Sequence, residues 1–260
     1  MTSTVSEPVR DDRAAVDKAI SLLVAFGAEA AGGLGVSELA RRAQLSKSTA
    51  FRVLGMLERN GVVERTGRGY RLGERLHQLG RSVYAPGHER IRDLLLPFLT
   101  DLYEATRQTV HLAALHGTEV FYLAKLYGHR AVPAPSRIGG RLPAHCTAVG
   151  KVLLAYDFEV AEAALAAPLP EVTARTITDP AVLAAELARI RRDGVAFDDE
   201  ESRLGLSCVA APVFSRGHAV AALSVAGHRV GFDAGKAASE VRRIAAAASQ
   251  TAQRHRVAWP

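Results

Sequence analysis

The sequence predicts an α+β protein with two folded parts: a small helical unit that carries a β-hairpin, and a larger domain of helices around a mostly antiparallel sheet. Two observations support this. The chain has 260 residues, 48% hydrophobic and 23% charged, which is enough for two buried cores. Short helical patterns crowd the first 73 residues, whereas strands alternate with helices after residue 86. We expect a disordered arm (1–12), a first domain (13–73), a linker helix (74–85) and a second domain (86–260).

Three short helices are expected in the first domain. An apolar stripe at helical spacing predicts the first helix, from 14 to 26, through Val16, Ala19, Ile20 and Leu23. Ser37 and Ser46 are typical N-caps, and we expect them to begin the second and third helices. Only a short turn separates these two helices, so they must cross steeply. This is the spacing of a helix-turn-helix.

A β-hairpin is predicted directly after the third helix. Asn60-Gly61 ends that helix, because glycine readily takes the positive φ of a helix C-terminus. Strands at 62–65 and 70–72 then flank the glycine-rich turn 66–69. A helix-turn-helix followed by such a hairpin is a winged helix-turn-helix, and this is the fold that we predict for the first domain.

Positive charge is concentrated in the same region. The net charge of the chain is +6, and residues 41–81 hold ten Lys or Arg against three Glu. This local excess is typical of a nucleic-acid-binding unit. We expect Arg52 to read base edges and the hairpin arginines to contact phosphate or the minor groove. The residues assigned to DNA contact are Ser46, Lys47, Ser48, Thr49, Arg52, Arg65, Arg68 and Arg71.

The second domain begins after Ala85-Pro86-Gly87, which marks a boundary. Helical patterns cover 89–106, 147–156, 159–166, 180–193 and 234–254. Strand patterns cover 110–115, 120–126, 195–201, 207–214 and 219–227. A short linker helix, 74–82, precedes them. Strands that follow one another through tight turns, as at 116–119, indicate antiparallel pairing.

Two long motifs of the second domain resemble those of the isocitrate lyase regulator (IclR) family. Residues 143–155 read P-A-H-C-T-A-V-G-K-V-L-L-A and resemble the family's P-x-H-x-x-A-x-G-K-x-L-L-A segment. Residues 198–201 read D-D-E-E and residues 205–213 read G-L-S-C-V-A-A-P-V, which resemble its D-x-E-E and G-x-x-C-x-A-x-P-V signatures. The winged helix-turn-helix precedes them in the expected order, so the resemblance covers nearly the whole chain.

The resemblance implies a transcriptional regulator with a winged helix-turn-helix joined by a linker helix to a GAF-like domain. Such regulators act mostly as repressors and sometimes as activators, and we expect a repressor. The GAF-like domain would bind a small organic effector. The resemblance also implies a homodimer, or a dimer of dimers, on a palindromic operator in double-stranded DNA. Dimerisation has an independent reason, because one recognition helix reads only a few base pairs.

The effector residues are carried over by position in the motifs. They are Ala144, Asp198, Leu206, Cys208 and Ser224. We interpret Asp199 and Glu201 as solvated acidic residues. The small side chains of Ala144 and Ala226 predict a roomy, weakly polar pocket. A small acid and an aromatic or hydroxylated metabolite both remain candidate effectors.

An enzyme and a redox sensor are the two alternative functions. An enzyme is disfavoured because G-x-S-x-G, H-E-x-x-H, a P-loop and G-x-G-x-x-G are missing, so we expect no catalytic residue, cofactor or metal site. His111 and His116 are interpreted as strand-end residues. A redox sensor would use Cys146 and Cys208, with a neighbouring histidine lowering a thiol pKa. No apolar run is long enough for a membrane span, and two cysteines fit a reducing cytoplasm.

Overall fold

The computed structural model describes residues 14–27, 32–67, 69–81, 88–129 and 132–255. The chain divides into two compact units, Met1–Tyr84 and Ala85–Pro260. The predicted disordered arm and the end of the predicted linker helix lie outside the described residues. Each unit is taken by itself below.

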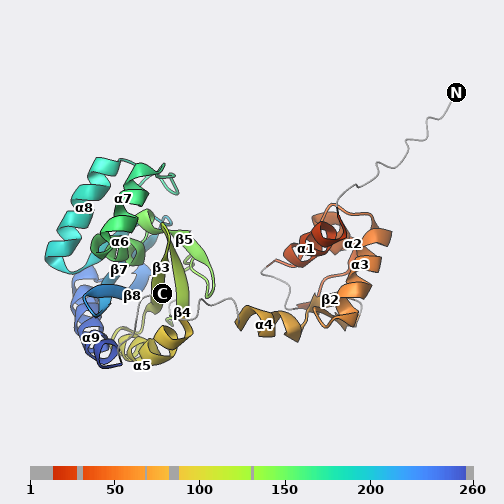
Figure 1. Cartoon of the computed structure of the whole chain (residues 1–260), viewed down its shortest axis with the longest axis horizontal. Coiled ribbons are helices and arrows are strands. Elements are labelled where there is room, and N and C mark those ends of the chain that lie inside the picture. The colour runs from red at the N-terminus through yellow and green to blue at the C-terminus, as the bar shows by residue number, and fades with distance from the viewer. Residues whose placement is uncertain (1–13, 28–31, 68, 82–87, 130–131, 256–260) are drawn as a thin grey trace. The chain divides into compact units, whose positions relative to one another are not determined.

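The first unit is a winged helix-turn-helix, as predicted (Figure 1). Its elements are α1 (Ala15–Ala25), α2 (Val36–Arg42), α3 (Lys47–Arg59), β1 (Val63–Thr66), β2 (Gly69–Leu72) and α4 (Glu74–Arg81). One apolar core joins α1, α2 and α3 to the hairpin, with Phe26, Leu39 and Leu54 fully buried in it. The expected apolar face of α3 is therefore the face that holds the three helices together.

Helices α2 and α3 begin in different ways, α3 with a local side-chain cap and α2 without one. The hydroxyl of Ser46 accepts a hydrogen bond from the amide of Thr49, so its prediction as the N-cap of α3 is confirmed. The corresponding prediction for Ser37 is wrong, because α2 begins at Val36 and is preceded by Gly35. The chain just before α2 is held by β-type hydrogen bonds between the backbones of Leu34 and Tyr70. That long-range pairing brings the helix start forward.

The second unit is built on one sheet of six strands. The strands are β3 (Thr109–His116), β4 (Glu119–Leu126), β5 (Arg141–Pro143), β6 (Ala196–Asp199), β7 (Leu206–Ser215) and β8 (His218–His228). Their order is β5-β4-β3-β8-β7-β6, and every neighbouring pair is antiparallel. The α+β prediction with an antiparallel sheet is confirmed, although the pattern did not predict the three-residue strand β5.

Helices cover the two faces of this sheet (Figure 1). The helices of the unit are α5 (His88–Thr106), α6 (Ala148–Tyr156), α7 (Phe158–Ala166), α8 (Pro180–Asp193) and α9 (Ala234–Arg254), with a short 3₁₀ turn, η2 (Ala144–Cys146), before α6. Helices α5 and α9 pack on one face, and α6 packs on the other, with α7 and α8 outside it. Consequently α6 is buried from Ala148 to Ala155.

No helix in the described part of the chain is long and apolar enough to cross a membrane.

Candidate functional sites

The amino-terminal half of α3 presents an exposed polar surface. Lys47, Ser48 and Arg52 are exposed, and Thr49 is half-buried. The hydroxyl of Ser46 lies 2.8 Å from that of Thr49 and 3.1 Å from that of Ser48, so the cap gathers three hydroxyls at the start of the helix. The structure therefore brings five of the predicted DNA-binding residues onto one helix end.

Ion pairs decide which cations of the first unit remain available. Glu38 binds both Arg41 and Arg42, at 2.7 and 2.6 Å. These hydrogen bonds lower the pKa of Glu38 to about 2. Within the described residues, Lys47, Arg52 and Arg59 form no ion pair, and all three lie on α3. The helix that was predicted to read DNA thus carries three cations that no carboxylate of the described residues compensates.

The arginines of the hairpin are engaged within the unit. Register places Arg65 opposite Tyr70 and Arg71 opposite Glu64, so the two arginines lie on opposite faces of the hairpin. Arg65 donates to the hydroxyl of Tyr70 at 3.1 Å, and Arg71 donates to Glu64 at 2.7 Å. That both arginines contact phosphate or the minor groove stays a prediction, and each of them already has a partner within the unit. Arg68 lies outside the described residues.

One exposed aromatic residue of α3 was missed. Phe51 is 55% exposed, and the guanidinium of Arg65 lies 5.9 Å from its ring centroid. Apolar side chains on a recognition helix can contact the methyl group of thymine. The signal was present in the sequence, because Phe51 falls outside the buried stripe formed by Ala50, Val53 and Leu54.

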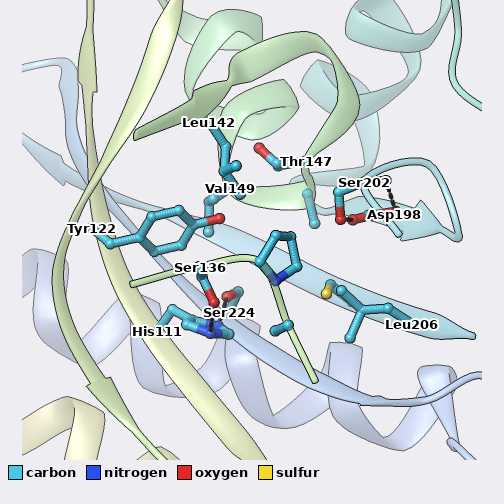
Figure 2. A pocket seen from close by; sticks show the side chains of 14 residues that line it. His111, Tyr122, Ser136, Leu142, Thr147, Val149, Asp198, Ser202, Leu206 and Ser224 are labelled. Carbon is cyan, nitrogen blue, oxygen red and sulfur yellow. Dashed lines mark hydrogen bonds between the residues drawn. The ribbon is translucent and has the colours of Figure 1, made fainter. Parts of the chain in front are cut away.

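A small cavity lies in the second unit, between the sheet and the start of α6 (Figure 2). Its lining residues come from all six strands of the sheet, from the start of α6 and from two connecting segments. They are His111, Tyr122, Ala134, Pro135, Ser136, Leu142, Thr147, Ala148, Val149, Asp198, Ser202, Leu206, Cys208 and Ser224. The free volume is about 20 Å³, enough for one water molecule but not for an organic ligand. The prediction of a roomy pocket is wrong for this conformation, in which Ala134, Pro135 and Ser136 close one side of the cavity.

Four of the five predicted effector residues line this cavity: Asp198, Leu206, Cys208 and Ser224. Cross-strand register explains why they meet. Cys208 pairs with Asp198 on β6, and Ala210, two residues further along β7, pairs with Ser224 on β8. The fifth residue, Ala144, is fully buried and does not line the cavity. It lies against Gly150, so Thr147, Ala148 and Val149 form the adjoining wall instead.

Asp198 organises the turn that follows β6. One of its oxygens accepts from the amides of Glu201 at 2.8 Å and Ser202 at 3.3 Å, and the other accepts from the Ser202 hydroxyl at 2.6 Å. Burial raises the pKa of Asp198, while these hydrogen bonds act in the opposite direction. Its carboxylate is therefore already satisfied by its own turn.

A buried ion pair lies beside this turn. The ammonium of Lys151 on α6 binds the carboxylate of Glu201 and lies 3.7 Å from that of Glu186 on α8. The interpretation of Glu201 as solvated is wrong, because Glu201 is 7% exposed. The side chain of Asp199 is half exposed and pairs with Arg229, as expected of a surface carboxylate. Burial removes the Glu201 carboxylate from water, and this is the main reason why its pKa is raised.

A buried hydrogen-bonded chain lies on the opposite side of the cavity (Figure 2). His111 contacts the hydroxyl of Ser224 through Nδ1 at 3.2 Å and that of Ser136 through Nε2 at 2.8 Å. Lys125 Nζ donates to the hydroxyl and the carbonyl oxygen of Ser136, at 3.1 and 2.9 Å. Burial, with a smaller contribution from Lys125, lowers the pKa of His111 to about 3. His111 is thus a cavity residue inside β3, and only His116 ends the strand.

The thiol pKa values of the two cysteines are raised, whereas a redox-sensing cysteine needs a lowered pKa. Burial raises the pKa of Cys146 to about 12 and raises that of Cys208 well above its usual value. The neighbouring His145 binds the carbonyl oxygen of Pro170 at 3.1 Å, and burial lowers its own pKa. A neutral imidazole cannot stabilise a thiolate by charge, so the expected lowering of a thiol pKa is wrong.

Among the residues that the structure describes, no group of three or more His, Cys, Asp or Glu is placed to hold a metal ion.

A winged helix with unpaired cations on its recognition helix, together with a separate unit that encloses a polar cavity, defines a class: ligand-responsive DNA-binding regulators. Comparisons give the family. Residues 15–67 match the IclR helix-turn-helix domain, and residues 85–253 match the family described as bacterial transcriptional regulator IclR C-terminal. The chain belongs to the IclR family of transcriptional regulators, with an effector-binding carboxyl-terminal domain.

Known relatives agree with this assignment. The HTH-type transcriptional regulator XynR of Escherichia coli is 39% identical over 219 residues, which cover 81% of this chain and 84% of that protein. The IclR structure of Thermotoga maritima has a TM-score of 0.79 at 32% identity and covers 94% of this chain and 98% of its own. An IclR homologue from Microbacterium hydrocarbonoxydans, complexed with 4-hydroxybenzoate, has a TM-score of 0.75 at 31% identity, with coverages of 92% and 98%. These relatives are regulators and not enzymes.

Proposed function

We propose that this regulator represses transcription by binding a palindromic operator as a homodimer or a dimer of dimers, and that a small organic effector releases it. The observation that supports the DNA-binding role is the set of unpaired cations on α3, namely Lys47, Arg52 and Arg59. A regulator that reads chromosomal DNA works in the cytoplasm, which is where we place it.

Within this surface we assign different roles to the predicted residues. Arg52 is exposed in the middle of α3 and reads a base edge, while Lys47 and Arg59 contact phosphates. Ser46, Ser48 and Thr49 orient the start of the helix and contact the backbone of the duplex. Arg65 positions the hairpin against Phe51 and Tyr70. Arg71 and Arg68 contribute to affinity but not to sequence choice.

Replacement of Arg52 tests the base-reading role. Operator-like duplexes are first selected from a random pool with the full-length protein, and affinities are then measured by fluorescence anisotropy. Arg52→Ala should weaken binding to the selected duplex by about 1–3 kcal/mol and relax sequence preference at one position. Arg71→Ala is the control, because its guanidinium is paired with Glu64. Equal losses on selected and random duplexes for Arg52→Ala would exclude base reading.

We propose that the cavity beneath α6 is the effector site. Leu206, Cys208 and Ser224 would contact the effector directly, while Asp198 would hold the turn that carries Ser202. The bound 4-hydroxybenzoate of the Microbacterium homologue makes hydroxylated aromatic acids sensible first compounds. A ligand releases DNA only by binding one of two arrangements more tightly than the other.

Ser224→Ala tests the effector site. The variant should bind the selected duplex as wild type does, because Ser224 lies in the second unit. Release of that duplex by an active compound should require a higher concentration, since one hydroxyl is worth about 0.5–1.5 kcal/mol. Anisotropy titrations with compound measure both quantities. Unchanged release would remove Ser224 from the site.

A further inference from the structure

Phe51 is a large apolar residue on the exposed side of α3. It is 55% exposed, and it lies between Lys47, four positions earlier, and Gly55, four positions later. Residues four apart lie one above the other on a helix, so these three form a single row along α3. A lone exposed apolar residue is common on protein surfaces. What singles out Phe51 is its place in this row, on the helix that carries Arg52.

The hairpin does not account for the exposure of Phe51. The guanidinium of Arg65 on β1 lies 5.9 Å from the centroid of the Phe51 ring and 5.4 Å from that of the Tyr70 ring. It also donates to the Tyr70 hydroxyl at 3.1 Å and lies 3.8 Å from the carboxylate of Glu58. Arg65 is therefore held by Tyr70 and Glu58 without Phe51. More than half of the phenylalanine stays open to an approaching ligand.

Gly55, one turn after Phe51, is not required by the packing of the first unit. It lies inside α3 with a helical backbone, where alanine is the better helix former. Among the described residues, a Cβ atom at this position would meet a single atom within 4 Å, Nη1 of Arg59 at 3.9 Å, which is an ordinary contact. The missing side chain therefore leaves a hollow in the surface of α3 that the fold itself does not use.

The surroundings of this hollow indicate what it binds. The three cations of α3 that lack an ion-pair partner among the described residues are exposed on the same helix, and they are Lys47, Arg52 and Arg59. Such cations bring the phosphate backbone of DNA against this side of α3, so the groups that reach the hollow are the edges of bases. In the major groove, the apolar group of a base edge is the C5-methyl group of thymine.

We propose that Phe51 and Gly55 form a notch that binds the C5-methyl group of one thymine in the operator, with the methyl group against the Phe51 ring and over the Cα atom of Gly55. The proposal rests on the assignment of α3 as the helix that reads DNA. Binding removes the methyl group and the exposed ring from water, which is favourable. Phe51 thus determines specificity beside Arg52: the arginine recognises hydrogen-bonding atoms, and the notch recognises a methyl group that uracil lacks.

Replacing single thymines by uracil tests the notch, because uracil pairs as thymine does and lacks only the methyl group. In a duplex selected from a random pool with the full-length protein, each thymine is replaced in turn, and affinities are measured by fluorescence anisotropy. One replacement should weaken binding by wild type roughly three- to fivefold, as expected for one buried methyl group. Phe51→Ala should bind the thymine and uracil duplexes equally at that position. Met56→Ala, another exposed apolar residue of α3, is the matched control and should keep the preference.

A second variant fills the hollow. Gly55→Ala should fold at least as stably as wild type in thermal denaturation, because alanine favours the helix and its Cβ atom meets no close neighbour. The same variant should lose the preference for thymine over uracil, since its own methyl group takes the place of the base methyl. A stable protein without thymine preference separates recognition from folding. If Gly55→Ala kept the wild-type preference, the hollow would have no part in recognition and the notch would be refuted.

The failure of the notch and the failure of the DNA-reading role of α3 give different results. If no uracil replacement changes binding by wild type, or if Phe51→Ala keeps the preference, the notch is wrong while Arg52 still tests the role of the helix. Loss of the preference in Met56→Ala as well would show that Phe51 has no specific part in it. If neither Phe51→Ala nor Arg52→Ala alters selectivity, α3 is not the helix that reads DNA, and both proposals fail.

Discussion

A buried histidine makes the stability of the second unit depend on pH. His111 has a pKa of about 3 in the folded chain, because burial disfavours its charged form, against 6.5 for the unfolded chain. Between these values the unfolded state binds a proton that the folded state does not. The contribution of the neutral His111 to the free energy of unfolding is therefore complete above pH 6.5. It is lost as the pH falls from 6.5 towards 3.

His111→Gln measures this contribution. When the pH is lowered from 7 to 5.5, the free energy of unfolding of wild type should fall by about 1 kcal/mol more than that of the variant. Urea denaturation followed by circular dichroism measures both values. His88 and His145 have lowered pKa values too, so the difference between the proteins, and not the wild-type slope, is the readout. Parallel pH profiles would show that His111 binds its proton equally well in the folded and the unfolded state.

Single residues differ in how far the sequence predicts them. Ser46 and Gly61 were predicted because capping depends on a few neighbouring residues. The burial of Glu201 was not predicted, since its partner Lys151 lies 50 positions earlier on a different element. The chain of Lys125, Ser136, His111 and Ser224 joins three strands and a connecting segment, and no local pattern reveals such a contact.

At the scale of elements, the first turn of α6 packs closely against the preceding 3₁₀ turn, η2. A Cβ atom at Gly150 would overlap the backbone of Ala144, including its carbonyl oxygen. Backbone atoms cannot move aside as a flexible side chain can. The glycine of the G-K motif is therefore explained by packing, and it fixes η2 beneath the first turn of α6.

Gly150→Ala should destabilise the second unit by several kcal/mol, at the upper end of single substitutions, or prevent its folding. Gly235→Ala, in the first turn of α9, is the matched control, because its Cβ would make only an ordinary contact with Asp233. That control should change stability by less than about 1 kcal/mol. Thermal denaturation of both variants measures the difference. Similar melting temperatures would refute the packing argument.

Periodicity predicted the longer elements well. All five helices of the second unit and its five longer strands lie within a few residues of their expected ranges, because each has an apolar pattern of its own. Strand β5 and turn η2 have three residues each and no measurable period. They exist because tertiary contacts hold them, such as the pairing of Glu119 with Pro143.

At the scale of the molecule, the net charge of +6 divides into paired and unpaired parts. Salt dependence of DNA affinity separates them, since each phosphate contact adds about 0.9 to the slope of log K against log salt. Lys47→Ala and Arg59→Ala should each reduce the slope by about one per subunit. Arg41→Ala, whose guanidinium is paired with Glu38, should reduce it less. Anisotropy titrations over a range of salt concentrations test this, and equal reductions would contradict the assignment.

The strand order has a consequence for the time at which each unit becomes functional. The centre of the sheet joins β3 to β8, so His111 meets Ser224 across 113 positions of sequence. Contacts between distant positions slow folding, and the centre of this sheet cannot form until β8 has been synthesised. The first unit closes through contacts within its own 84 residues. A nascent chain therefore completes its DNA-binding surface well before it completes the cavity that would control it.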